Sequence, residues 1–270
     1  MLINIIQGII QGLTEFLPVS SSGHLTLFQH FTGRHDLEAN IFTDIALHFG
    51  TLLAVIFYFR ADLLPFFTIS GLKDSKVRRL GLLIITASVP TALIGLFFEK
   101  KFEAVFSSPS LVAIALFVTG LLLLIAEKIK TKQSTNRLEN ITELSYTKAA
   151  IVGIAQGLAV TPGISRSGTT ISAGLLSNLK GEDAARFSFL LMIPAVGGAT
   201  LLHILKAFKA GIPASVEVSA LFLGMIVAAV TGFLSLRFLS YIIKKQKLSY
   251  FAYYLFAVSL AALFFINFAG

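Results

Sequence analysis

The 270-residue chain contains no cysteine, which excludes disulfide bonds and metal sites built on thiolates. Charge is also scarce, because 13% of the residues are charged whereas a soluble domain has about 25%. The first residues include neither a basic segment nor an A-x-A cleavage site, so we expect no removable signal peptide. Apolar residues dominate instead, at 55% of the chain with a mean hydropathy of +0.82. This balance indicates a protein that is built in a membrane.

Long apolar runs fill most of the sequence and contain almost no charge. A helix of ~19 residues reaches ~28 Å, close to the thickness of the bilayer hydrocarbon core. The strands of a membrane barrel would alternate in polarity and would not run continuously apolar. We therefore predict an all-α polytopic membrane protein with a single integral membrane domain over residues 1–270. The predicted full spans are 41–59, 80–98, 111–126, 187–208, 219–236 and 250–268.

The net charge of +8 raises the question of a nucleic-acid partner. Most Lys and Arg fall between the predicted spans, where they set membrane topology and contact anionic headgroups. No basic motif interleaved with aromatic residues is present. We therefore expect membrane lipids, and no nucleic acid, among the partners. The sequence leaves the oligomeric state open, with a homodimer as one option.

Two further apolar regions, 1–30 and 149–178, are interrupted by Gly, Pro and Ser where a spanning helix would be continuous. Pro18 and Pro162 each remove a backbone donor and break a helix locally. Broken apolar segments at corresponding places in two halves are typical of transporter-like repeats with a site at the membrane midplane.

The two broken regions also match each other in sequence. Gln-Gly-Leu occurs at 11–13 and again at 156–158, an offset of 145 positions. Ser-x-Ser-Gly occurs at 20–23 and 165–168 with the same offset. We predict two internal repeats. Their approximate bounds are 1–130 and 146–270.

Basic residues predict how the spans are oriented. Segments 60–79 and 127–148 each hold five Lys or Arg and 237–247 holds four, whereas 99–110 holds two. By the positive-inside rule the first three segments are cytoplasmic. With six full spans, this holds only if each broken region returns to the face from which it entered.

We therefore predict two re-entrant helix hairpins that enter from opposite faces, so that the halves form inverted-topology repeats. Both termini and the first hairpin would face the exterior. Non-helical backbone at this depth is tolerated only where it is buried in protein or lines a wet cavity. The tips, 17–23 and 162–168, are expected to meet near the middle of the membrane.

The hairpins carry the polar groups that are costly in such surroundings. Glu15 is an ionisable residue at membrane depth, which indicates a functional site. Gln11 lies four residues earlier, so both side chains share one helix face. Oxygen ligands of this kind suit Mg²⁺ or Ca²⁺. We predict that Glu15 and Gln11 bind such a divalent cation.

A Ser/Gly-rich turn that leads into a helix presents backbone N–H groups to an anion. Ser20, Ser21, Ser22 and Gly23 form such a turn, and they precede His24, which can act as an acid or a base near neutral pH. Close packing of a helix tip is the alternative explanation for Ser and Gly here.

Arg166 lies at the tip of the second broken region, where a guanidinium suits bidentate binding of phosphate. A structural ion pair with Glu15 is the alternative. The acid, the serines, the histidine and the arginine together favour phosphoryl chemistry. Asp44 and His48 are four residues apart on the first full span, and their role stays open.

The segments QGLTEFLPVSSSGH and PGISRSGTT resemble the two motifs of the undecaprenyl-pyrophosphate phosphatase family, bacterial membrane enzymes linked to bacitracin resistance. The resemblance implies hydrolysis of the terminal phosphate of undecaprenyl diphosphate, which recycles the lipid carrier for peptidoglycan synthesis. It also implies a divalent cation, paired re-entrant hairpins, and a multi-pass protein of the bacterial plasma membrane with its active site facing the exterior. Many members have Glu where this chain has Gln11.

On this resemblance we hypothesise that Ser21 attacks the terminal phosphorus and that His24 moves its proton. His24 as the nucleophile, and water activated by the metal, remain open. The predicted catalytic residues are Ser21, His24, Glu15 and Arg166. The predicted substrate-binding residues are Ser20, Ser22, Gly23, Ser165, Arg166, Ser167, Gly168 and Thr169.

Two other functions are compatible with parts of this sequence. A type-2 phosphatidic acid phosphatase also uses SGH and SR elements. It needs a His five residues beyond its Arg-containing motif. Here the Ser165-Arg166 pair is followed by SGTTISAGLLSN, which contains no His. A lipid flippase or transporter would share the inverted-repeat fold, but fold alone does not establish function.

Overall fold

The structure, a computed structural model, describes residues 1–34, 36–132, 137–210, 216–244 and 247–268, and every named element of secondary structure among them is a helix. No β-strand occurs among these residues, in agreement with the predicted all-α class. The α-helices are α1 (Leu2–Phe16), α2 (Ser21–Phe31), α3 (Leu37–Tyr58), α4 (Arg60–Leu63), α5 (Ile69–Lys73), α6 (Ser75–Phe106), α7 (Pro109–Lys132), α8 (Tyr146–Leu158), α9 (Arg166–Leu176), α10 (Gly181–Ala210), α11 (Val218–Lys244) and α12 (Ser249–Phe268). Two short 3-10 helices are η1 (Leu64–Phe67) and η2 (Ile141–Glu143).

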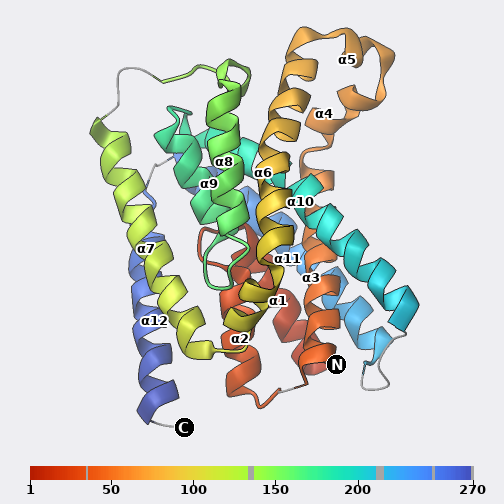
Figure 1. Cartoon of the computed structure of the whole chain (residues 1–270), viewed down its shortest axis with the longest axis vertical. Coiled ribbons are helices and arrows are strands. Elements are labelled where there is room, and N and C mark those ends of the chain that lie inside the picture. Colours follow the sequence, from red (N-terminus) through yellow and green to blue (C-terminus); the bar gives the residue numbers. More distant parts are fainter. Residues whose placement is uncertain (35, 133–136, 211–215, 245–246, 269–270) are drawn as a thin grey trace.

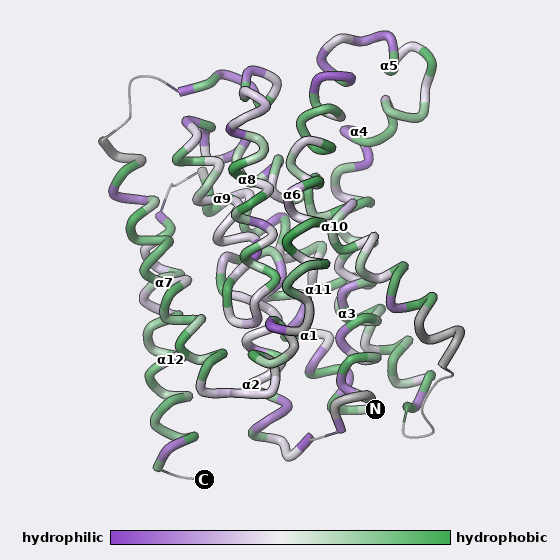
Figure 2. Tube along the Cα trace, viewed as in Figure 1, coloured by the Kyte–Doolittle hydropathy of each residue, from purple (hydrophilic) through white to green (hydrophobic). Residues whose placement is uncertain are grey.

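Within the described residues, six helices are long and apolar enough to cross a membrane, which confirms the six predicted spans and a multi-pass membrane protein. Their outer faces carry exposed large side chains such as Phe97, Phe222 and Tyr253. Figure 2 shows hydrophobic residues along these helices and hydrophilic ones concentrated at their ends. The candidate spans are Ala39–Tyr58, Ser75–Phe98, Pro109–Ile129, Gly181–Leu205, Val218–Ile243 and Ser249–Phe268.

Some helices extend beyond the predicted spans. Helix α6 begins at Ser75, where the prediction began at residue 80, because the Asp74 side chain accepts a hydrogen bond from Lys76 N at 2.7 Å and caps the helix. The prediction followed apolar residues, whereas a helix begins at its capping residue. Helix α10 likewise begins six positions before the predicted 187.

Each broken region folds as two short helices joined by a turn. Helix α1 ends at Phe16 because Leu17 precedes a proline and is held extended, with φ −63° and ψ 144°. Ser20 then adopts φ +69°, and its hydroxyl accepts from Gly23 N at 3.3 Å to cap α2. In the second region Ser165 caps α9 in the same way, accepting from Gly168 N at 3.0 Å.

The two turns meet inside the molecule. Helices α1 and α2 extend from their turn toward the end that carries both termini, whereas α8 and α9 extend toward the end with α4 and α5 (Figure 1). Ser167 donates to the Leu17 carbonyl at 3.0 Å. A Cβ on Gly23 would lie 3.1 Å from Gly163 Cα. The predicted contact between the tips 17–23 and 162–168 is therefore confirmed.

Neighbouring long helices hold the short ones in place. Helix α1 packs along α11, and α8 packs along α6. Helix α7 pairs with α12 and also contacts α2 and α9. Phe16, at the end of α1, is fully buried and meets the Phe189 ring of α10 edge-on at 5.6 Å. This packing positions the end of α1, where Glu15 lies.

Candidate active site

Glu15 is the centre of a buried polar cluster. It lies in the last turn of α1 and is 6% exposed. The Ser21 hydroxyl donates to its Oε2. The Gln11 amide donates to the same oxygen at 3.0 Å, and Arg166 Nη2 donates to Oε1 at 2.6 Å. Three predicted site residues therefore converge on the carboxylate of a fourth, Glu15.

The pairing of Glu15 with Arg166 joins the two halves of the chain. The residues are 151 positions apart, and both side chains are largely buried. A buried carboxylate needs a cation and hydrogen-bond donors, because water no longer stabilises its charge. Arg166 supplies the cation from the first residue of α9. The ion pair that the sequence left as an alternative is thus present, within the same cluster as Ser21.

The helices α2 and α9 both begin beside this cluster, at Ser21 and Arg166. The N-terminus of a helix carries partial positive charge and unpaired N–H groups. Arg166 also donates weakly to the Ser188 carbonyl, at 3.5 Å. Two positive helix ends and one guanidinium make this region suitable for a phosphate group.

The predicted substrate-binding residues of the first turn also shape it. Ser20 caps α2, and its Oγ lies 3.4 Å from that of Ser22. Gly23 has little room for a side chain, because a Cβ would lie 2.8 Å from Leu116 Cδ2 and 3.1 Å from the backbone of Gly163. These contacts explain the geometry of the turn that holds Ser21 against Glu15.

The second turn is built by equivalent contacts. The backbone N–H of Ser165 donates to Thr119 Oγ1 at 3.1 Å, and the Ser165 and Ser167 hydroxyls lie 3.2 Å apart. A Cβ on Gly168 would lie 3.3 Å from Pro18 Cβ, so the glycine permits the close approach of the first turn. The Thr169 hydroxyl is buried and has no hydrogen-bond partner.

Both ring nitrogens of His24 contact groups other than Glu15 and Ser21. Its Nδ1 lies 2.8 Å from the Ser20 carbonyl, which can only accept, so Nδ1 carries a proton. Its Nε2 lies 2.8 Å from the Tyr254 hydroxyl, and the two rings are stacked. The sequence did not predict a contact with Tyr254, because this residue lies on α12, 230 positions after His24, and belongs to no motif.

His48 of α3 is the residue that the structure adds to the cluster. Its Nε2 lies 3.6 Å from Glu15 Oε2, and its Nδ1 lies 2.7 Å from the Asp44 carbonyl. The Asp44 carboxylate accepts from the Gln29 amide at 3.0 Å. The i, i+4 spacing of Asp44 and His48 was the only sequence signal, and it did not reveal that His48 faces α1.

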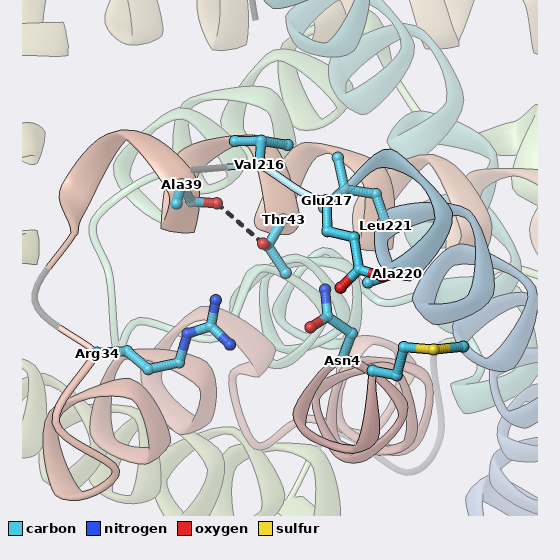
Figure 3. A pocket seen from close by; sticks show the side chains of 9 residues that line it. Asn4, Arg34, Ala39, Thr43, Val216, Glu217, Ala220 and Leu221 are labelled. Carbon is cyan, nitrogen blue, oxygen red and sulfur yellow. Dashed lines mark hydrogen bonds between the residues drawn. The ribbon is translucent and has the colours of Figure 1, made fainter. Parts of the chain in front are cut away.

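A separate pocket lies near the start of α1. It has a volume of about 150 Å³, and Arg34, Asn4 and Glu217 line it together with residues from the starts of α3 and α11 (Figure 3). None of the predicted site residues lines it. The face of α1 that begins at Asn4 continues through buried Gln7 and Gln11 to Glu15. One polar helix face therefore leads from this pocket to the cluster.

The residues present fit a divalent cation with oxygen ligands. No group of three or more His, Cys, Asp or Glu is gathered in the described part of the chain. However, Gln11 Oε1 is buried beside Glu15 and has no hydrogen-bond partner. A carboxylate and an amide carbonyl, completed by water and substrate oxygens, are ligands that Mg²⁺ and Ca²⁺ accept.

Comparison with known proteins shows which family the chain belongs to. A family model described as bacitracin resistance protein BacA matches residues 4–261. A protein of Geotalea daltonii named undecaprenyl-diphosphatase is 44% identical over 272 residues, covering 97% of each chain. Proteins with the same name from Halothermothrix orenii and Alkaliphilus metalliredigens are 43% and 41% identical, covering 94% of this chain and 93% and 94% of their own. The chain therefore belongs to the bacitracin resistance protein BacA family.

Proposed function

We propose that the protein hydrolyses undecaprenyl diphosphate to undecaprenyl phosphate and inorganic phosphate. This reaction recycles the lipid carrier for peptidoglycan synthesis and gives resistance to bacitracin. Membership of the family and the name shared by the relatives support the substrate. The observation that carries the proposal is the buried Glu15, which joins the Ser21 hydroxyl and the Arg166 guanidinium at two helix N-termini.

Binding of the terminal phosphate falls to Arg166 and the starts of α2 and α9. Arg166 donates one N–H group to Glu15 Oε1. The planar guanidinium has five N–H donors, so others can bind phosphate oxygens. The partial positive charge of the two helix ends adds to this attraction. The apolar outer faces of the membrane helices suit the polyprenyl chain.

The first chemical step is attack of Ser21 Oγ on the terminal phosphorus. A Ser21 Oγ–P bond forms while the bond from phosphorus to the bridging oxygen breaks, and undecaprenyl phosphate leaves. Glu15 accepts the Ser21 proton, because the hydroxyl already donates to its Oε2. Water then hydrolyses the phosphoserine and releases inorganic phosphate. The contacts of His24 with Ser20 and Tyr254 favour Glu15 over His24 in this role.

Glu15 and Gln11 are the residues that would hold a divalent cation. When bound, such a cation neutralises negative charge that develops on the phosphate oxygens. The unpartnered Gln11 Oε1 supports this assignment.

We further propose that α1–α2 and α8–α9 are re-entrant hairpins of two inverted repeats. Three observations support this. The hairpins extend toward opposite ends of the molecule (Figure 1), and α1 packs on α11 as α8 packs on α6. The third is that equivalent glycines of α1 and α8 accept equivalent hydrogen bonds from these long helices. The carbonyls of Gly8 and Gly153, 145 positions apart, accept from Thr231 at 3.3 Å and Thr91 at 2.8 Å. The end with both termini would face the exterior of the bacterial plasma membrane.

Phosphate release from undecaprenyl diphosphate by the purified protein in detergent tests the proposal. Ser21→Ala and Arg166→Ala are each expected to lower the rate at least about 10²-fold. Ser172→Ala is the matched control, because this buried serine of α9 has a hydroxyl without a hydrogen-bond partner. If the folded wild type releases no phosphate with any divalent cation, the hydrolase proposal fails and lipid flipping becomes the better explanation.

The covalent step has its own test. Substrate labelled in the terminal phosphate is mixed with the protein and quenched. Label that resists acid and is lost in base identifies phosphoserine, and it should be absent in Ser21→Ala. Label that is lost in acid would instead assign the attack to a histidine, and no covalent label at all would favour water.

A further inference from the structure

His48 stands close to Glu15 without forming a hydrogen bond to it. The 3.6 Å between His48 Nε2 and Glu15 Oε2 is longer than a normal N–H···O bond, which spans about 2.7–3.2 Å. Two atoms that bind one ion at ~2.1 Å each lie about 3–4 Å apart, depending on the angle between them. The observed separation agrees with two ligands of a shared cation.

The other ring nitrogen determines what His48 presents to Glu15. Nδ1 lies 2.7 Å from the Asp44 carbonyl, which can only accept, so Nδ1 carries the proton. In the neutral ring Nε2 then directs a lone pair at a carboxylate oxygen, and the two repel. A cation between them turns this repulsion into attraction. Metal-binding histidines commonly hold their second nitrogen on a backbone carbonyl in this way.

Gln11 supplies a third donor at the same place. Its Nε2 is engaged by Glu15 and by Thr51, at 3.0 and 3.4 Å, while its Oε1 is buried and has no partner. An unpartnered buried carbonyl costs about 1–3 kcal/mol. Glu15 keeps one free acceptor position, on Oε1, because Gln11 and Ser21 both donate to Oε2 and only Arg166 donates to Oε1.

We propose that His48 is a ligand of the divalent cation, together with Glu15 and Gln11. The inference rests on the proposed function only in placing a cation at Glu15. It changes the expected cation, because one imidazole nitrogen among oxygen ligands makes the site less suited to Ca²⁺, which takes oxygen ligands, than to a first-row metal such as Mn²⁺, which keeps the oxygen ligands and also accepts the ring nitrogen. The site should therefore bind Mn²⁺ in preference to Ca²⁺.

Pulsed electron paramagnetic resonance of the full chain loaded with Mn²⁺, without substrate, tests this proposal. The wild type is expected to show coupling of the Mn²⁺ electron spin to a directly bound nitrogen. His48→Gln should lose this coupling and weaken Mn²⁺ binding at least about 10-fold, with Ca²⁺ binding closer to that of the wild type. A carbonyl oxygen would replace the ring nitrogen in this variant.

His24→Gln and His30→Gln are the matched controls and should keep the nitrogen coupling. His24 contacts Ser20 and Tyr254, and His30 lies in the last turn of α2 against Phe31. A wild type without nitrogen coupling overturns the proposal whether or not any variant folds. Coupling that persists in His48→Gln also overturns it.

The hydrolase proposal stands or falls separately. Phosphate release that is lost on chelation, with no nitrogen coupling, would retain the hydrolase and reject His48 as a ligand. Nitrogen coupling from His48 without phosphate release would retain His48 as a ligand and reject the hydrolase.

Discussion

Removal of the Arg166 guanidinium should destabilise the fold through Glu15. In Arg166→Met the side chain keeps much of its apolar length but loses its charge. The Glu15 carboxylate, whose side chain is 5% exposed, then stays buried without its closest cation. Breaking a buried ion pair by removing one partner costs about 3–5 kcal/mol.

The remaining contacts of Glu15 set the size of this effect. Ser21 and Gln11 still donate to Oε2, and hydrogen bonds to a charged group contribute about 1.5–3 kcal/mol each. We therefore expect about 3 kcal/mol for Arg166→Met, at the lower end of the range. Glu15→Gln removes the buried charge. The double variant Glu15→Gln/Arg166→Met should therefore lose about 2 kcal/mol less unfolding free energy than the two single variants lose in sum.

The assay is an SDS titration of the purified protein, with helical circular dichroism as the readout. Arg186→Met is the matched control, because the Arg186–Asp62 ion pair is 40% and 18% exposed and should contribute only about 0–1 kcal/mol. The argument is refuted if Arg166→Met costs no more than Arg186→Met. It is also refuted if the loss of stability in the double variant equals the sum of the two single losses to within about 0.5 kcal/mol.

Three further changes test other parts of the structure. Gly163→Ala should lower stability by at least about 2 kcal/mol, because Gly163 has φ +87° and a Cβ would lie 2.5 Å from Val112 O; an unchanged melting temperature would contradict this. Gln7→Leu should raise stability by about 1–2 kcal/mol, since both amide atoms of Gln7 are buried without partners; a lower stability in the same titration would mean that the amide has a partner such as bound water. Tyr254→Phe should cost about 1 kcal/mol through its hydrogen bond to His24 and should leave phosphate release near the wild-type rate; a fall of about 10²-fold would assign the pair to proton transfer.

The parts of the fold that follow from local chemistry were predictable. The six spans could be predicted because a membrane helix must be apolar over its length, and they match helices of the structure. The turns after Phe16 and after Leu158 could be predicted because proline, glycine and serine break helices. Helix ends were less accurate, since the start of α6 depends on the Asp74 cap and not on hydropathy.

The candidate site was predictable in composition and less so in geometry. Gln11, Glu15, Ser21 and Arg166 were predicted from the ionisable and hydroxyl groups at apolar positions, and they converge. The direction of His24 was not predictable, because it depends on Tyr254 of a distant helix. His48 reaches Glu15 only because α3 packs beside α1, which a spacing along α3 cannot reveal.

The division of the cluster between two turns has a physical consequence. Glu15 and Ser21 come from the first turn, whereas Arg166 comes from the second. Neither turn alone could keep its charge buried, because a carboxylate or guanidinium without its partner would have to remain in water. Meeting of the turns, which Gly23 and Gly163 permit by close approach, therefore satisfies both charges and brings together the groups that the proposed mechanism uses. In that mechanism, a phosphate bound to the Arg166 guanidinium would take part of the cationic partner of Glu15, and Glu15 would then become a better acceptor for the Ser21 proton. Binding of the substrate would thus activate the nucleophile at the same position.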